Sequence, residues 1–165
     1  MYLTVSDQSS TALHLILHVN IVYTILWFIL EILLFIFKYY HLTYAANAFG
    51  LEISLVFIVC FNDLIRHFFG IKGNLTLQPG LLIIFILYGL FSALGFVFFL
   101  ILQSYSQRTE ILLSGIGLLL ILIEILLAII TIIRNRRAMS ILTPEQKIVR
   151  LNQAQKRFQL SIKNQ

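Results

Sequence analysis

Four long apolar runs constrain this chain more than any other feature of its sequence. They cover about residues 13–37, 45–69, 79–102 and 110–133. Crossing the hydrocarbon core of a bilayer takes roughly 20 apolar residues in an α-helix, so each run is long enough to span it. None of the runs alternates apolar and polar residues in the manner of a membrane strand. The sequence therefore predicts an all-α integral membrane protein, a four-helix bundle with short loops and a basic C-terminal tail.

The composition supports this prediction. Hydrophobic residues make up 59% of the chain and charged residues 12%, whereas a soluble domain carries about a quarter charged residues. A chain of 165 residues cannot hide that much apolar surface in its own core, so lipid must cover the rest. The single cysteine, Cys60, lies inside an apolar run, where we expect a packing role.

The distribution of charge predicts the topology. We divide the chain into an N-terminal segment (1–12), a four-span domain (13–137) and a basic tail (138–165). We expect the first run to be a retained span, because it has neither the basic flank nor the cleavage site of a signal peptide. Four spans place both termini on one side of the membrane. The same side has Lys72 and the eight lysines and arginines from Arg134 onward, out of twelve in the chain. The positive-inside rule then places both termini in the cytoplasm.

The tail has the signature of an amphipathic helix. Thr143 is a suitable N-cap, Pro144 suits the first helical position, and Gln146 completes a capping box. Apolar residues then recur at helical spacing among basic ones, at Ile148, Leu151, Phe158 and Ile162. Such a helix would lie on the anionic inner leaflet of the membrane. A frayed, solvated tail is the alternative, and the sequence does not decide between the two.

Ionisable residues within the spans need an explanation, because an isolated charge in lipid is costly. They are Glu31, Glu52, Asp63, Arg66 and Glu124. Asp63 and Arg66 are three residues apart on one helix face, so we expect them to pair, with Glu124 competing for Arg66. The two remaining acids either bind a proton or a cationic substrate, or join helices as protonated or hydrogen-bonded groups. We favour the structural interpretation, because the spans contain few polar residues and no interrupted helix.

No residue pattern indicates catalysis or a cofactor. The sequence contains no nucleophile–base pair, no phosphate-binding loop and no cluster with metal-ligand spacing. It also has no folded basic domain with interleaved aromatic residues, which nucleic-acid binding would favour. We therefore expect no catalytic residues, no metal, no cofactor and no nucleic-acid partner.

The segment after the second apolar run contains a distinctive motif. Asp63 stands three residues before Arg66, and Gly70 follows four residues later. The motif is completed by Lys72, Gly73, Asn74, Leu75 and Pro79. It resembles the signature of the transmembrane protein 17/216/80 family. Further similarities lie at Glu31 with Lys38, Glu52, residues 102–105, Glu110 and Glu124, so the resemblance covers roughly residues 20–133.

The family pattern usually has glutamate where this chain has Asp63, and a polar residue where it has Leu77. We predict a turn over Gly70–Asn74, in which Gly70 ends the second helix and both glycines are free to adopt positive φ. Asn74 would bond to the backbone of its own turn, and Pro79 would start the next helix. The turn either contacts a partner protein or only connects the two spans.

The resemblance implies a function that composition alone does not indicate. Members of this family are four-span proteins of the ciliary transition zone. They work in the Meckel–tectonic membrane module, which supports cilium assembly and restricts which membrane proteins enter the cilium. The resemblance thus implies a structural component rather than an enzyme, with tectonic-like and Meckel-complex proteins as partners. The alternative is a small four-helix transporter that uses Glu31 as a proton-coupled carboxylate.

Overall fold

The computed structural model describes residues 10–43, 48–104, 107–140 and 144–163. Every regular element within these ranges is an α-helix, so the predicted all-α fold is confirmed. The helices are α1 (Thr11–His41), α2 (Ala48–Thr76), α3 (Pro79–Ile101), α4 (Arg108–Ser140) and α5 (Pro144–Lys163). The first four are long and apolar enough to cross a membrane.

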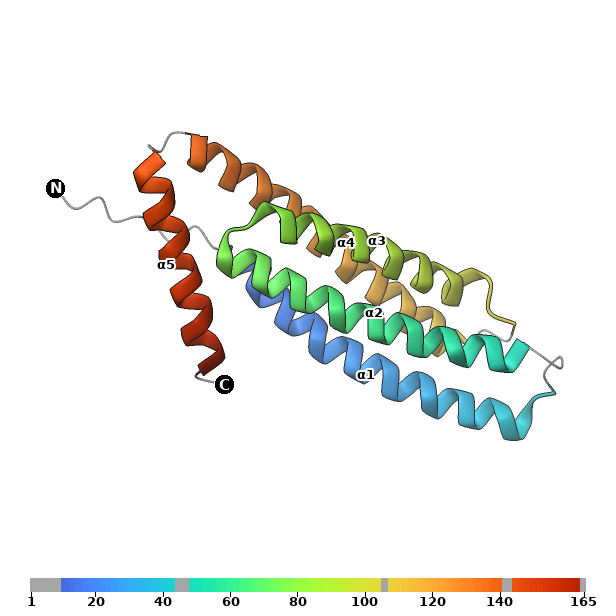
Figure 1. Cartoon of the computed structure of the whole chain (residues 1–165). Helices are drawn as coiled ribbons and strands as arrows, with labels where there is room; N and C mark the ends of the chain where they lie inside the picture. Colours follow the sequence, from blue (N-terminus) through green and yellow to red (C-terminus); the bar gives the residue numbers. More distant parts are fainter. Residues whose placement is uncertain (1–9, 44–47, 105–106, 141–143, 164–165) are drawn as a thin grey trace.

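The four long helices form a closed antiparallel bundle (Figure 1). Contacts join α1 to α2, α2 to α3, α3 to α4 and α4 back to α1, so the ring follows chain order. We call the end beside α5 the tail end; it holds the start of α1, the end of α2, the start of α3 and the end of α4. The opposite end, where α1 and α3 finish, is called the loop end.

Aromatic and aliphatic side chains fill the interior of the bundle. The ring of Trp27 lies 4.9 Å from that of Phe96 and 5.6 Å from that of Phe99, measured between centroids. A smaller cluster near the tail end contains Leu13, Leu17, Leu82, Phe85 and Ala128. The outward faces are also lined with exposed leucine, isoleucine and phenylalanine. An exposed apolar surface of this extent is suited to contact with lipid.

The prediction of a turn over Gly70–Asn74 was wrong, because α2 continues as a helix to Thr76. No glycine in the described residues has a positive φ; the reversal lies at Leu77, whose φ is 55°. A Cβ atom on Gly70 would lie 2.8 Å from the Phe85 ring, and one on Gly73 would lie 3.0 Å from the Leu81 Cβ. The two glycines therefore allow close packing against α3, and α2 extends seven residues past the predicted end of the second span.

The tail is helical, and α5 lies across the tail end of the bundle beside α2 (Figure 1). Thr143, the predicted N-cap, lies outside the described residues, and so does the side chain of Phe158. Of the predicted apolar stripe, Ile148 and Ile162 are 60% and 58% exposed, and Leu151 is half-buried. Ala154, which lies outside that stripe, is buried. The exposed isoleucines are thus left available for a surface outside the bundle.

Candidate functional site: the buried polar network

A group of charged side chains that we call the arginine cluster lies between α2, α3 and α4. Arg66 is fully buried, and its Nε donates a hydrogen bond of 3.1 Å to Asp63 Oδ1. Its Nη1 bonds to Glu124 Oε2 from α4. The predicted pair of Asp63 and Arg66 is confirmed, and Glu124 joins that pair rather than replacing Asp63. One guanidinium group therefore serves two carboxyl groups on two helices, with the Phe85 ring 5.3 Å away.

Neutral side chains extend this cluster onto α3. The Ser92 hydroxyl donates to Asp63 Oδ1, and Asn62 Nδ2 donates to Ser92 Oγ over 2.6 Å. Asn62 Nδ2 also donates to the carbonyl oxygen of Tyr88 over 3.1 Å. Through these bonds the acid of α2 is attached to α3 as well as to α4. A hydrogen-bonded polar group inside a membrane bundle joins helices, because unpaired polar atoms are costly in hydrocarbon.

His67 belongs to the same cluster. Its Nδ1 lies 2.6 Å from the Asp63 carbonyl oxygen, one helical turn earlier. Its Nε2 lies 3.8 Å from Glu124 Oε1. The sequence did not single out His67 or Asn62 as functional, although the polar positions 62, 63, 66 and 67 repeat at helical spacing.

A second buried group, the lysine cluster, joins α1 to α4 at the loop end. Lys38 Nζ lies 2.5 and 2.7 Å from the two carboxylate oxygens of Glu110. Both side chains are fully buried. Glu110 also accepts bonds from Gln103 Nε2 at 3.4 Å and from the backbone N–H of Gln107 at 2.8 Å. The sequence singles out Lys38 and Glu110 only through the family resemblance. They are 72 positions apart, and no spacing rule predicts that two such distant residues pair.

Glu31 and Glu52, for which the sequence left two interpretations open, differ in their hydrogen bonds. Glu52 Oε1 accepts a hydrogen bond from the backbone N–H of Ser104 over 2.8 Å, so it attaches α2 to the segment after α3. Glu31 is fully buried, and neither of its carboxyl oxygens has a hydrogen-bond partner among the described residues. Its main charged neighbours are Glu110 and Lys38 of the lysine cluster. The structural interpretation thus accounts for Glu52 directly, and leaves Glu31 as the one sequence-selected acid without a hydrogen bond in the described chain.

The remaining family-motif residues hold the tail end together. Asn74 is fully buried; its Oδ1 accepts from the Ser10 N–H and its Nδ2 donates to the Ser10 carbonyl, both over 3.0 Å. Ser10 is also the N-cap of α1, where its hydroxyl accepts from the Leu13 N–H. The prediction that Asn74 bonds to its own turn was wrong, because it fixes the start of α1 to the end of α2.

The other motif residues occupy simpler positions. Leu75 is half-buried, and Pro79 begins α3 as predicted. Lys72 Nζ lies 5.7 Å from the centroid of the Phe68 ring. Among the described residues, no group of three or more histidines, cysteines or acids is placed to hold a metal ion. The buried polar groups that the structure describes are mainly used to join one helix to another.

Comparison with known proteins agrees with the resemblance. A family model named Transmemb_17, described as a predicted membrane protein, matches residues 15–121. Transmembrane protein 216 of Homo sapiens is 32% identical over 124 residues, which cover 75% of this chain and 86% of that protein. Transmembrane protein 216 of Danio rerio is also 32% identical over 124 residues, covering 78% of its own length. No solved structure matches the chain.

Proposed function

This chain belongs to the Transmemb_17 family and is a relative of transmembrane protein 216, and on that premise we propose that it is a structural component of the ciliary transition zone. In this proposal it is a subunit of the Meckel–tectonic membrane module, which supports cilium assembly and controls which membrane proteins enter the cilium. Its partners are tectonic-like and Meckel-complex membrane proteins. It acts by packing and not by catalysis, so it is not an enzyme.

The arginine cluster is the observation that best supports a structural role. Its charged and polar groups from three helices bond to one another inside the bundle. A transport path needs polar groups that can exchange a substrate or a proton, whereas groups bonded in this way fix helix positions. A rigid four-helix unit with short connections presents a fixed outer surface, and such a surface suits a subunit of a membrane assembly.

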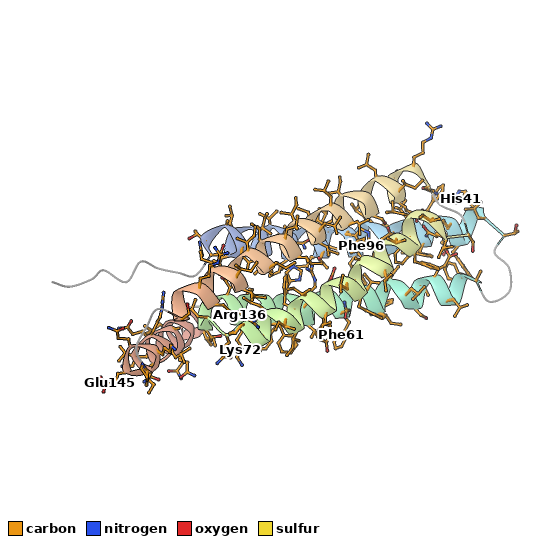
Figure 2. All side chains as sticks on the ribbon, turned by 90° about the horizontal axis from the view of Figure 1, so that it is seen from above. His41, Phe61, Lys72, Phe96, Arg136 and Glu145 are labelled. Carbon is orange, nitrogen blue, oxygen red and sulfur yellow. The ribbon has the colours of Figure 1, made fainter. Side chains whose placement is uncertain are left out.

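The topology belongs to the same proposal. At the tail end, Lys72 and Arg136 lie close to the basic α5, whereas His41 lies at the loop end (Figure 2). We propose that the tail end faces the cytoplasm and that α5 contacts the anionic inner leaflet. Basic residues near that surface gain about 1 kcal/mol each from the negative surface potential.

Imaging tests the proposed location. A copy of the full chain tagged after Gln165 should form a ring at the base of the cilium in ciliated cells. The Arg66→Ala variant should lose this ring, because it leaves two buried carboxyl groups without their common partner. The Arg136→Ala variant changes an exposed arginine and should keep the ring. A uniform distribution of the unchanged chain over the cell membrane would contradict the proposal.

A second candidate function is proton-coupled transport, because Glu31 is buried without a hydrogen bond in the described residues. Purified protein in vesicles should then carry a proton flux that Glu31→Gln abolishes. Glu52→Gln is the matched control, since Glu52 already bonds to the Ser104 backbone. A flux absent from both the unchanged chain and the control would exclude this candidate and leave the structural role.

A further inference from the structure

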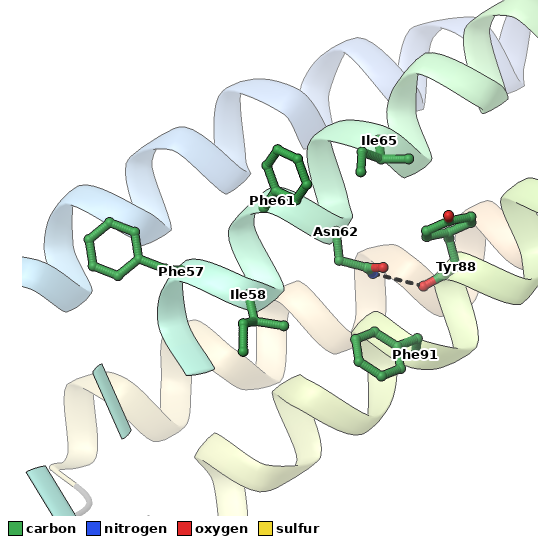
Figure 3. Close-up of a pocket in the computed structure, with 7 residues that line it drawn as sticks. All are labelled: Phe57, Ile58, Phe61, Asn62, Ile65, Tyr88 and Phe91. Carbon is green, nitrogen blue, oxygen red and sulfur yellow. Dashed lines mark hydrogen bonds between the residues drawn. The ribbon is translucent and has the colours of Figure 1, made fainter. Parts of the chain in front are cut away.

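A groove on the outer face of α2 and α3 contains two polar atoms that the bundle does not use (Figure 3). The groove has a volume of about 540 Å³ and is lined by Phe57, Phe61 and Ile65 from α2 and by Tyr88 and Phe91 from α3. Asn62 lies at its base, where its Nδ2 is bonded to the Tyr88 carbonyl and to Ser92.

The two unused atoms are the Asn62 carbonyl oxygen and the Tyr88 hydroxyl. In both hydrogen bonds of the Asn62 side chain the nitrogen is the donor, and Tyr88 accepts one of them through its backbone carbonyl oxygen. In the part of the chain that the structure describes, no group donates to Asn62 Oδ1 and none pairs with the Tyr88 hydroxyl. Neither atom is enclosed by the surrounding side chains, so both are accessible from outside the bundle.

Their depth makes this arrangement unusual. Asn62 lies within the second apolar run (45–69), seven residues before its end, and Tyr88 lies near the middle of α3 (Pro79–Ile101). Acyl chains offer no hydrogen-bonding group at that depth, and water is scarce there. Leaving a polar group unpaired in hydrocarbon costs free energy, whereas pairing it across helices favours their association. The groove therefore suits an occupant with both a donor and an acceptor at the same depth within the membrane.

We propose that the occupant is a second copy of this chain. A two-fold axis along the membrane normal keeps the same topology in both copies and places identical residues at identical depth. The Tyr88 hydroxyl of each copy can then donate to the Asn62 carbonyl oxygen of the other, so one patch supplies both halves of the bond. The inference does not depend on the ciliary location.

Two bulky side chains stand at the edges of this groove. Phe61 is 66% exposed and stands at the edge of the groove, and Phe91 is 52% exposed on the opposite edge. A two-fold arrangement lets the phenylalanine at the edge of one copy enter the groove of the other. Close packing and interhelical hydrogen bonds are the terms that drive association of helices in lipid.

Energy transfer between two labelled populations of the purified full chain in lipid vesicles tests the proposal. Transfer should rise with the protein-to-lipid ratio. At each ratio it should exceed the transfer measured for a monomeric membrane protein. Tyr88→Phe removes one accessible oxygen from each copy, and should raise the ratio needed for half-maximal transfer by about tenfold. Tyr40→Phe, at a residue 76% exposed on α1, is the matched control and should cause no shift.

Two results of this experiment would overturn the proposal. The first is transfer no greater than that of the monomeric standard at every ratio, in which case lipid or a helix of another protein covers the groove. The second is self-association that Tyr88→Phe and Tyr40→Phe affect equally. Asn62→Leu should weaken association as well, and a thermal unfolding curve separates that effect from loss of the internal Ser92 bond.

Cysteine cross-linking identifies the face that self-associates. In a chain carrying Cys60→Ala, the added substitution Phe61→Cys should give a covalent dimer on mild oxidation. Leu126→Cys, at an equally apolar residue of α4 that is 60% exposed, should not. Equal cross-linking at both positions would show random collision and would contradict a dimer built on this groove.

Discussion

Arg66 joins its own helix, α2, to two other helices of the bundle. It bonds to Asp63 on its own helix and to Glu124 on α4, and it lies over the Phe85 ring of α3. A buried ion pair adds little stability compared with an apolar pair, but breaking one is costly because the remaining charge is stranded. The consequence of the cluster is therefore clearest when one member is removed.

The first prediction concerns this residue. Arg66→Ala should lower the free energy of unfolding by about 3–5 kcal/mol, because two buried carboxyl groups lose their common partner. Asp63→Asn should cost less, since Arg66 keeps its bond to Glu124. Thermal unfolding in detergent measures both. Arg136→Ala, at an exposed position of the same residue type, is the control. Equal stability of Arg66→Ala and this control would show that the cluster has no structural role.

The sequence predicted only part of this network. The pair of Asp63 and Arg66 follows from their spacing, and Glu124 follows from its similar depth in the bilayer. Ser92 could not be found in the same way, because a lone serine in an apolar helix gives no sign of which neighbour it faces. The pairing of Lys38 with Glu110 depends on how the two span ends meet in space.

At the scale of the helices, hydropathy located all four spans but did not fix their ends. The second run was predicted to stop at residue 69, whereas α2 continues to Thr76. Its final turns contain Gly70 and Gly73, which lower local helix propensity. Tertiary packing overcomes this, since the glycines admit α3 and Asn74 is held by Ser10. Such contacts cannot be read from a hydropathy pattern.

The second prediction tests close packing of α2 against α3. Gly95→Ala should lower the free energy of unfolding by about 1–3 kcal/mol, because the added methyl group would overlap a γ-methyl group of Val59. Val59 is buried and β-branched, so it cannot easily turn aside. Gly50→Ala is the control, with open space around the added atom. Adding Val59→Ala to Gly95→Ala should recover part of the loss; a strictly additive double variant would contradict direct contact.

The third prediction concerns the attachment of α1 to α4 at the loop end. Lys38→Met or Glu110→Gln alone should destabilise the chain by about 3–5 kcal/mol, since each leaves one fully buried group of the pair without its partner. The double variant should be more stable than either single one, because no lone charge remains. Unfolding curves of all three, with Arg108→Met at an exposed position of the same end as control, provide the measurement. Destabilisation that simply adds in the double variant would argue against the pairing.

At the scale of the whole molecule, the four spans anchor the chain and α5 adds a peripheral contact. We therefore predict that deleting residues 143–165 leaves the protein in the membrane fraction. A peptide of this stretch should become helical on anionic vesicles and remain disordered on neutral ones, because its exposed isoleucines stand among basic residues. High salt should weaken the binding, since it screens the surface potential. Circular dichroism records the change; absence of helix on anionic vesicles at low salt would leave α5 as a protein-docking or solvated element.

The last prediction concerns the orientation of the bundle. Lys38 is paired with Glu110, so the loop end has less uncompensated positive charge than its composition suggests. The tail end carries Lys72, Arg134, Arg136 and Arg137 in addition to α5. Under the positive-inside rule, this asymmetry keeps the tail end in the cytoplasm. The sequon Asn74-Leu75-Thr76 should therefore carry no glycan, and a glycosidase-sensitive mass shift removed by Asn74→Gln would reverse the assignment.

A missing glycan at Asn74 is weaker support than a glycan found elsewhere, because its side chain is fully buried against Ser10. A long flexible insert with its own sequon separates orientation from access. Placed between Ser104 and Gln107 at the loop end, the insert should be glycosylated, since that end faces away from the cytoplasm. The same insert placed between Leu77 and Gln78 at the tail end should remain unmodified. Because the two inserts differ only in the end of the bundle that carries them, the opposite pattern could arise only from an inverted bundle.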